Sequence, residues 1–514
     1  MKSRRILGSL IALTLGAQAA HAESLTPEQA LERARRANPD LAAAIADLEA
    51  ARAEVRAADR ARAVPVLRAS IDGQHAERFS PTGDGVAQNS DDTISASVDV
   101  THTTAIGTAL VFGFDFSNRW SHSNASRASA SRTSRTRDLS TTEGITLGPN
   151  QSALLTLGVR QPLLKGAGAG PVLSPLRQAQ ARARAASAAQ LAAASQVAHD
   201  VLVAYGELWY AQESLAVEDA ALALTERQLA DTETRVNILK TVPEIDRLRL
   251  ATERASRRQR VLAAKATVTQ RQLTLARLMA LEMAAARTLV AAKPPAPEAT
   301  TAPIPRVEAL IARAEAASLE LAQARAGLDQ AKERVRLASD DALPRLDLTG
   351  TLSGGAIRTD DGAASGFPGG RPAIVAMIGL EFEWPVGAST ADANLDAARA
   401  DLRAAQARYQ SKKDQLGAQI ASLESDLATT QAALELAVEN VKVASDLAAR
   451  ENAQLALGTV LLTEVISAQQ TAREAELTRL RALVDIAASA LELDHLTGDL
   501  LARRLTAAPT EPTP

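Results

Sequence analysis

A heptad repeat in residues 391–457 constrains the fold of this chain more than any other feature of its sequence. This period is typical of helices that pack along a narrow seam. At about 1.5 Å per residue the helix would measure roughly 100 Å, far more than a helix inside a compact domain. The repeat therefore predicts a long coiled coil with a partner helix alongside it. Large apolar residues form its two complementary series: Leu395, Leu402, Tyr409, Leu416 and Leu423, and Ile420, Leu427, Leu434, Val441 and Leu455.

Prolines and polar linkers divide the chain into two halves of similar order. Each half reads as a shorter helix, a non-helical block, a very long helix, a tight turn and a medium helix. Pro65 and Pro344 stand at matching helix-to-strand junctions, and Pro162 and Pro385 at matching strand exits. We therefore predict an internally duplicated chain. The helical stretches are expected at about 26–63, 173–239, 244–285, 305–340, 391–457 and 461–502.

The non-helical blocks alternate apolar and polar residues with a period of two, as strands do. In 374–384 the apolar residues fall on one face, while Glu381 and Glu383 fall on the other. A tilted membrane strand needs only about 9–11 residues. We therefore predict membrane strands, with Glu381 and Glu383 facing a watery lumen where a charge has no membrane penalty. Polar stretches at 79–92, 121–150 and 359–372 are interpreted as extracellular loops.

The N-terminus has the pattern of a secretory signal peptide. Basic residues precede an apolar run at 6–17, and Ala20-His21-Ala22 forms a cleavage site. No later stretch is long and apolar enough for a membrane helix, so insertion would require strands. The chain has no cysteine, which excludes disulfides and thiolate metal sites.

Charge and composition exclude other classes of function. The signal carries three of the 57 basic residues, so 54 remain against 60 acidic ones, and a net charge near −6 does not suit a nucleic-acid partner. The six histidines show no metal-ligand spacing. The glycine-rich segment 166–171 does not fit the nucleotide-binding pattern G-x-G-x-x-G, because Pro171 occupies the position of its third glycine. We expect no enzyme activity, no cofactor and no metal site.

Several local segments together are similar to the TolC-type outer membrane efflux protein family. They occur in the family's order over the whole mature chain. The resemblance implies a homotrimer in which each protomer gives four strands to a shared barrel and its helices to a periplasmic conduit. The segments are Leu25-Thr26-Pro27-Glu28-Gln29-Ala30-Leu31 with Asn38-Pro39, Gln161-Pro162-Leu163-Leu164, Leu343-Pro344-Arg345-Leu346-Asp347-Leu348-Thr349, and Leu457-Gly458-Thr459 followed by Glu464-Val465.

The same resemblance implies a fold class and a set of partners. The fold class is an α+β membrane protein, with a transmembrane β-barrel shared between protomers and a long α-helical coiled-coil tube in the periplasm. The partners are a periplasmic adaptor (membrane fusion) protein, an inner-membrane transporter and outer-membrane lipid. The block at 64–163 is too long for two strands, so a hairpin at about 93–118 either extends above the membrane or enlarges the barrel.

Candidate site residues follow from the family's inner hairpin ends. By position, its acidic constriction falls on Asp246 and Glu464, which three-fold symmetry would turn into carboxylate rings that favour cations. Either acid could instead simply cap its helix. The tips could grip the adaptor or merely close the turns. Ser467 and Val460 depart from the better-known members, so the closing interactions known there are not expected. The candidate docking residues are Val242, Pro243, Gly458, Thr459, Val460 and Leu461.

The predicted function is a passive exit duct in the outer membrane for a tripartite efflux or type I secretion system. The alternative is a periplasmic adaptor-like coiled-coil binding protein without a pore. We expect a signal peptide at 1–22, a first repeat at 23–290, a proline-rich linker at 291–305, a second repeat at 306–502 and a flexible tail at 503–514. The first repeat would hold strands at about 64–163 and a helical hairpin at 173–285, the second strands at 343–386 and a hairpin at 389–502.

Overall fold

The computed structural model describes most of the chain in two units. The predicted signal peptide lies outside the described residues. The sheet unit comprises Glu49–Ala185 and Ala324–Arg408, and the helical unit comprises Met1–Leu48, Ala186–Gln323 and Tyr409–Pro514. The described residues are 23–82, 85–128, 139–141, 145–239, 243–295, 305–358, 364–365, 373–384, 387, 389–457 and 459–505.

Long helices dominate the described part of the chain. Helices α4 and α9 have 61 and 68 residues, and each is followed by a helix of 35 residues, α5 or α10. The two shorter helices are equal in length and the two longer ones differ by seven residues; the internal duplication stays a prediction. The helices are α1 (Pro27–Ala37), α2 (Pro39–Ala63), α3 (Ala169–Val172), α4 (Ser174–Thr234), α5 (Glu244–Leu278), α6 (Met283–Ala286), α7 (Val307–Ala317), α8 (Leu319–Asp341), α9 (Thr390–Leu457), α10 (Leu462–Leu496) and α11 (Leu500–Leu505), with a π-helical turn at Arg235–Leu239.

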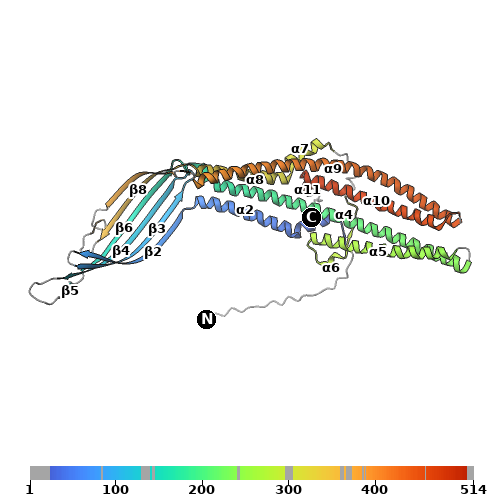
Figure 1. Cartoon of the computed structure of the whole chain (residues 1–514), viewed down its shortest axis with the longest axis horizontal. Helices are drawn as coiled ribbons and strands as arrows, with labels where there is room; N and C mark the ends of the chain where they lie inside the picture. The colour runs from blue at the N-terminus through green and yellow to red at the C-terminus, as the bar shows by residue number, and fades with distance from the viewer. Residues whose placement is uncertain are drawn as a thin grey trace, which may run out of the picture. The chain divides into compact units, whose positions relative to one another are not determined.

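Among the described residues, the sheet unit contains six long antiparallel strands in the order β10-β8-β6-β4-β3-β2 (Figure 1). The resemblance implied four strands, so this chain has two more. Two short strands pair with the sheet as well, β5 (Leu139–Thr141) with β4 and β9 (Ala364–Ser365) with β8. The long strands are β2 (Val66–Thr82), β3 (Gly85–Thr103), β4 (Ala109–Ala128), β6 (Ile145–Pro162), β8 (Arg345–Arg358) and β10 (Ala373–Glu383).

The strands reach further than the sequence predicts. Strand β3 runs through most of the stretch 79–92, and β4 and β6 cover both ends of 121–150. These stretches alternate poorly because polar residues occupy both faces, so their pattern resembles that of a loop. Backbone pairing with neighbouring strands nevertheless satisfies their N–H and C=O groups, and this does not require apolar side chains.

The long strands share one apolar face and one mostly polar face. Residues that pair directly across strands lie on the same face of a sheet. The register therefore places apolar side chains in continuous rows across the sheet. One row is Leu67, Val100, Phe112, Leu157, Leu352 and Ala376, and another is Ala69, Val98, Phe114, Leu155, Gly354 and Ile374.

The core of the helical unit forms around Tyr205 in the middle of α4. Its side chain is buried among residues of α1, α4, α5 and α10 and of two short parallel strands, β1 (Glu23–Leu25) and β7 (Leu289–Ala291). The Tyr205 hydroxyl lies 3.0 Å from the carbonyl oxygens of Leu25 and Lys293 and accepts a hydrogen bond from the Lys293 N–H. Tyr205 thus links β1 to the segment that follows β7. The sequence analysis did not predict β1 or β7.

Two helices predicted as continuous are interrupted. Asn38 separates α1 from α2 because Pro39 disfavours a helical conformation at the preceding residue. The Asn38 side-chain amide donates a hydrogen bond to the carbonyl of Leu278 at 2.9 Å. Leu278 is the last residue of α5, which therefore ends before the predicted residue 285. Ser318 separates α7 from α8 in the second half.

The C-terminal boundary also differs from the prediction. Helix α10 ends at Leu496 and α11 continues to Leu505, three residues into the predicted tail. Gly498 between them has φ +77°, and a Cβ there would lie 2.5 Å from the Ala317 carbonyl oxygen. Only glycine fits this turn without strain.

Candidate channel wall and periplasmic gate

An ion cluster lies on the polar face where β6, β8 and β10 meet. Asp347 is 1% exposed and accepts hydrogen bonds from Arg160 at 2.6 Å and from Arg345 at 2.8 Å. Arg345 also pairs with Glu383 at 3.3 Å and Glu381 at 3.8 Å. The two predicted lumen-facing glutamates therefore lie on the polar face, beside an arginine that shares their charge. A buried carboxylate is stable only when such partners surround it.

The two candidate gate acids lie at equivalent places on the two hairpins. Asp246 is in the first turn of α5 and pairs with Arg249 at 3.4 Å. Glu464 is in the first turn of α10 and accepts a hydrogen bond from the Leu461 backbone N–H at 3.2 Å. Each contact stays within its own helix: Glu464 caps the start of α10, whereas Asp246 forms an ion pair within α5 and does not cap that helix.

An apolar cluster joins the two hairpins close to these acids. Leu229 of α4, Leu250 of α5 and Leu462 of α10 are buried together, with Leu455 and Ile466 packed against them. Leu250 is one helical turn after Asp246, and Leu462 is two residues before Glu464. The cluster therefore packs the start of α5 against the start of α10.

The candidate docking residues that the structure describes lie at the ends of the hairpins. Pro243 and Leu461 are the N-cap residues of α5 and α10, and both are exposed. Thr459 is exposed and Val460 is half-buried. The remaining two candidates lie outside the described residues, namely Val242 and Gly458. An exposed apolar side chain such as Leu461 leaves surface that a partner can cover.

Polar contacts within the helical unit tie the first hairpin to the second. Glu218 of α4 and Arg473 of α10 form a buried, hydrogen-bonded ion pair. Asn452 of α9 accepts hydrogen bonds from Gln228 of α4 and Gln469 of α10, each at 3.1 Å. The sequence analysis missed these residues, since each is an ordinary polar residue of a charged helix and its partner is distant in sequence.

Arg257 of α5 is a second buried charge that the sequence did not reveal. Its side chain pairs with Glu253 at 2.9 Å, and Glu253 also accepts a hydrogen bond from Gln470 of α10 at 3.4 Å. Burial lowers the pKa of the Arg257 guanidinium, and the charge of Glu253 opposes this effect. An arginine remains charged under such a shift because its ordinary pKa is so high.

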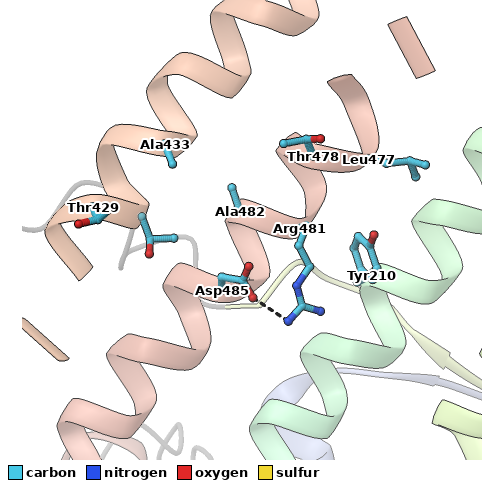
Figure 2. A pocket seen from close by; sticks show the side chains of 9 residues that line it. Tyr210, Thr429, Ala433, Leu477, Thr478, Arg481, Ala482 and Asp485 are labelled. Atoms are coloured by element: carbon cyan, nitrogen blue, oxygen red, sulfur yellow. Dashed lines mark ion pairs between the residues drawn. The ribbon is translucent and has the colours of Figure 1, made fainter. Parts of the chain in front are cut away.

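Glu207 of α4 binds arginines from two other helices, Arg271 of α5 at 3.2 Å and Arg481 of α10 at 2.8 Å. Arg481 also pairs with Asp485 at 2.7 Å and lies over the ring of Tyr210, 5.5 Å from its centroid. Arg481, Asp485 and Tyr210 line an open hollow of about 490 Å³ (Figure 2), which small and hydroxyl side chains of α9 and α10 also line. The contacts fix α10 against α4 and leave the hollow free.

Two histidines of the helical unit lie side by side with ring centroids 5.6 Å apart. His199 pairs with Glu492 at 2.8 Å and with Asp200 at 3.2 Å. Burial alone would lower the pKa of His199, but the two carboxylates outweigh it and raise that pKa. Burial and the charge of His199 lower the pKa of His495, whose ring is hydrogen-bonded to Ser195 at 2.7 Å.

The described residues contain neither a membrane-spanning helix nor a metal-binding cluster. In that part of the chain, no helix is long and apolar enough to cross a membrane. No group of three or more His, Asp and Glu side chains there could hold a metal ion.

The sequence profile of the outer membrane efflux proteins matches residues 310–499. The expected resemblance to this family is confirmed. No curated protein sequence matches the chain. The family match supports an outer membrane efflux channel and an outer-membrane location with a long helical periplasmic part, and it does not favour the adaptor alternative.

Solved structures of outer membrane proteins share the fold. The outer membrane protein VceC from Vibrio cholerae is 17% identical with a TM-score of 0.64, over 92% of this chain and 96% of that one. The Campylobacter jejuni CmeC outer membrane channel is 15% identical with a TM-score of 0.64, over 97% and 94%. The open state of the Neisseria gonorrhoeae MtrE outer membrane channel is 15% identical with a TM-score of 0.61, over 96% of both chains. At these identities the likeness concerns the fold.

Proposed function

We propose that this protein is the channel subunit of a tripartite efflux or type I secretion system and provides a passive exit duct across the outer membrane. The observation that carries the proposal is the sheet with one continuous apolar face. Large side chains on that face, such as Phe112, Phe114 and Leu157, remain more than one-third exposed. A soluble protein rarely leaves so large an apolar surface in water, whereas lipid would cover it without cost.

Closure of the sheet requires further copies of the chain. In lipid every backbone N–H and C=O group needs a partner, so a membrane sheet must close on itself. In the part of the chain that the structure describes, β2 and β10 each have one long-strand neighbour, which leaves two edges of a single copy open for pairing. We propose a homotrimer, as the family resemblance implies, whose sheets close into one barrel.

The helical hairpins form the periplasmic conduit in this proposal. The inner ends of α4–α5 and α9–α10 narrow to a gate at which Asp246 and Glu464 form rings of carboxylates. The hairpin tips at Pro243, Thr459, Val460 and Leu461, together with Val242 and Gly458, bind a periplasmic adaptor. The adaptor couples the channel to an inner-membrane transporter, which supplies the energy. Glu381 and Glu383 line the barrel near its helical end.

Ion conductance in planar bilayers tests both the channel and its gate. The purified protein is compared with the Asp246→Asn/Glu464→Gln variant, and Glu244→Gln serves as the matched control because Glu244 is an exposed acid in the same turn of α5. We expect a cation-selective pore that loses most of its selectivity in the double variant and keeps it in the control. Equal loss in the control would overturn the gate assignment. Absence of any conductance, with a protein that stays soluble without detergent, would overturn the channel.

A further inference from the structure

The two additional strands form a hairpin inside the sheet rather than an appendage of it. This inserted hairpin consists of β3 (Gly85–Thr103) and β4 (Ala109–Ala128). Strand β3 pairs with β2 from Val66↔Thr101 to Thr82↔Gly85, which is the whole length of β2. Strand β4 pairs with β6 from Ala109↔Arg160 outwards, with one irregularity between Arg119 and Ser121. The hairpin therefore separates β2 from β6 over their full height.

The turn of the inserted hairpin reaches the helical end of the sheet. It spans residues 104–108, next to the glycine-rich joint that leads from β6 into α3. The Gly168 N–H donates to the Ile106 carbonyl at 3.0 Å, and the Thr108 and Gln161 side chains are hydrogen-bonded. Gly107 has φ +91°, and a Cβ there would lie 2.6 Å from the Gly166 carbonyl oxygen. A hairpin held at this end cannot lie only above the membrane.

The inserted hairpin carries the same two faces as its neighbours. Val98 of β3 and Phe114 of β4 lie in one row with Leu155 of β6 on the apolar face. On the other face, hydroxyl pairs cross the strands, Ser70 with Ser97 at 2.9 Å and Ser117 with Ser152 at 2.7 Å. If lipid covers Leu155, it also covers Val98 and Phe114, because their side chains share one row.

Within the described residues, the edge strands β2 and β10 have no strand paired on their outer side. Ile71 on β2 is 81% exposed and Ile378 on β10 is 84% exposed, against 39% for Val98 and 42% for Phe114 on inner strands. Strand β2 runs away from the helical end and β10 runs towards it, because β2 follows α2 and β10 precedes α9. An edge β2 and an edge β10 from two copies would therefore pair antiparallel, like every other long pair of the sheet.

We infer that each copy contributes six strands to the membrane wall and that β2 of one copy pairs with β10 of a second copy, so that three copies close an eighteen-stranded barrel. This inference rests on the proposed channel function. Barrel diameter grows roughly linearly with strand number, so the pore is about 1.5 times as wide as a twelve-stranded one. Barrels of about 16–18 strands hold an open aqueous channel. The inserted hairpin thus widens a lumen lined by hydroxyl and carboxylate groups, which suits hydrated cargo.

Lipid contact of single labelled cysteines tests whether the hairpin spans the membrane. The chain has no cysteine, so each substitution carries one label. A fluorophore is attached in lipid vesicles at Val98→Cys and Phe114→Cys, with Leu155→Cys as the apolar reference and Ser97→Cys and Thr156→Cys as polar-face controls. We expect a quencher carried on lipid acyl chains to act on all three apolar positions, and a water-soluble quencher to act on both controls.

The outcomes separate the inference from the function on which it rests. Quenching of the labels at 98 and 114 by the water-soluble quencher, with quenching at 155 by the lipid quencher, would place the hairpin outside the membrane. That outcome would overturn the inference alone. Water-type quenching at Leu155 as well would overturn the membrane sheet and thereby the proposed function.

Cross-linking between copies tests the edge pairing. Ala69→Cys on β2 is combined in turn with Ala376→Cys and Leu380→Cys on β10, and the same β10 variants are combined with Ala96→Cys on β3 as controls. We expect a short bis-maleimide to give covalent dimers and trimers with Ala69→Cys and not with Ala96→Cys. Cross-linking through Ala96→Cys alone, or products larger than a trimer, would contradict an eighteen-stranded closure through β2 and β10.

Discussion

The sheet unit and the helical unit distribute apolar and charged residues in opposite ways. The sheet unit exposes its large apolar side chains and pairs Asp347 with Arg160 and Arg345 on its other face. The helical unit buries Tyr205 and its apolar neighbours together with the Glu218–Arg473 ion pair. The helical unit therefore has a core of its own, whereas the apolar face of the sheet stays exposed in a single copy.

Among these predictions, removal of one partner of the buried Glu218–Arg473 pair is expected to lower the stability of the protein most. Arg473→Leu leaves the Glu218 carboxylate buried without a counter-charge, which costs about 3–5 kcal/mol. We expect a corresponding fall in the urea midpoint, followed by the helical circular dichroism signal. Glu218→Leu/Arg473→Leu should recover most of the loss, because an apolar pair fits the same space. If the single variant is as stable as the wild type, the pair does not hold the hairpins together.

A charge on the apolar face of the sheet should have a somewhat smaller effect and only in lipid. Leu157→Arg is expected to cost about 2–4 kcal/mol of folding free energy, as charged residues do near the middle of a bilayer. Thr156→Arg, one residue away on the polar face, should be nearly neutral. Folding into vesicles at increasing urea concentration measures both variants. Equal effects at the two positions would contradict the assignment of the faces.

The histidine pair of the helical unit predicts a small dependence of stability on pH. Because the pKa of His199 is raised in the folded state, its contribution is complete below the ordinary value of 6.5 and is lost as the pH rises through the folded pKa. The pKa of Glu492 is lowered, mainly by the hydrogen bond from His199, so its contribution is lost only as the pH falls below its ordinary 4.5. The lowered pKa of His495 acts in the opposite direction to that of His199 below pH 6.5.

His199→Gln should therefore destabilise the protein more at pH 5.5 than at pH 8. We expect a difference under about 1 kcal/mol, because solvent screens these half-buried groups. Thermal unfolding of wild type and variant at both pH values measures it. A larger loss at pH 8 would mean that His199 is neutral in the folded protein.

Sequence reasoning located most helices and the strand character of both blocks, because these depend on local periodicity. It missed the polar outer parts of β3 and β4, where both faces are polar and no alternation remains. It also missed β1 and β7, which are three residues each and are stabilised by Tyr205 of α4. Short strands have no pattern of their own, so only their distant partner could reveal them.

The sequence predicts where the candidate site residues lie along the chain, but it predicts few of the side-chain contacts between them. Asp246, Glu464 and the tip residues follow from the family's order of segments, and the structure finds Asp246 and Glu464 at the starts of α5 and α10. The ion cluster around Asp347 was not predicted although Arg345 and Asp347 belong to the strand-entry segment. The cluster also requires Arg160, which is 187 residues away from Asp347 in the sequence.

By itself the sequence determined the length of the helices, the two-faced character of the strands and the resemblance to outer membrane efflux proteins, because each depends on the order of nearby residues. The tertiary structure alone decided that six long strands share one sheet and that Glu218 meets Arg473 across a separation of 255 residues. The physical reason is that strand pairing and buried charge pairs are settled by which backbone and side-chain groups need partners after the chain has folded, and local periodicity does not encode that choice.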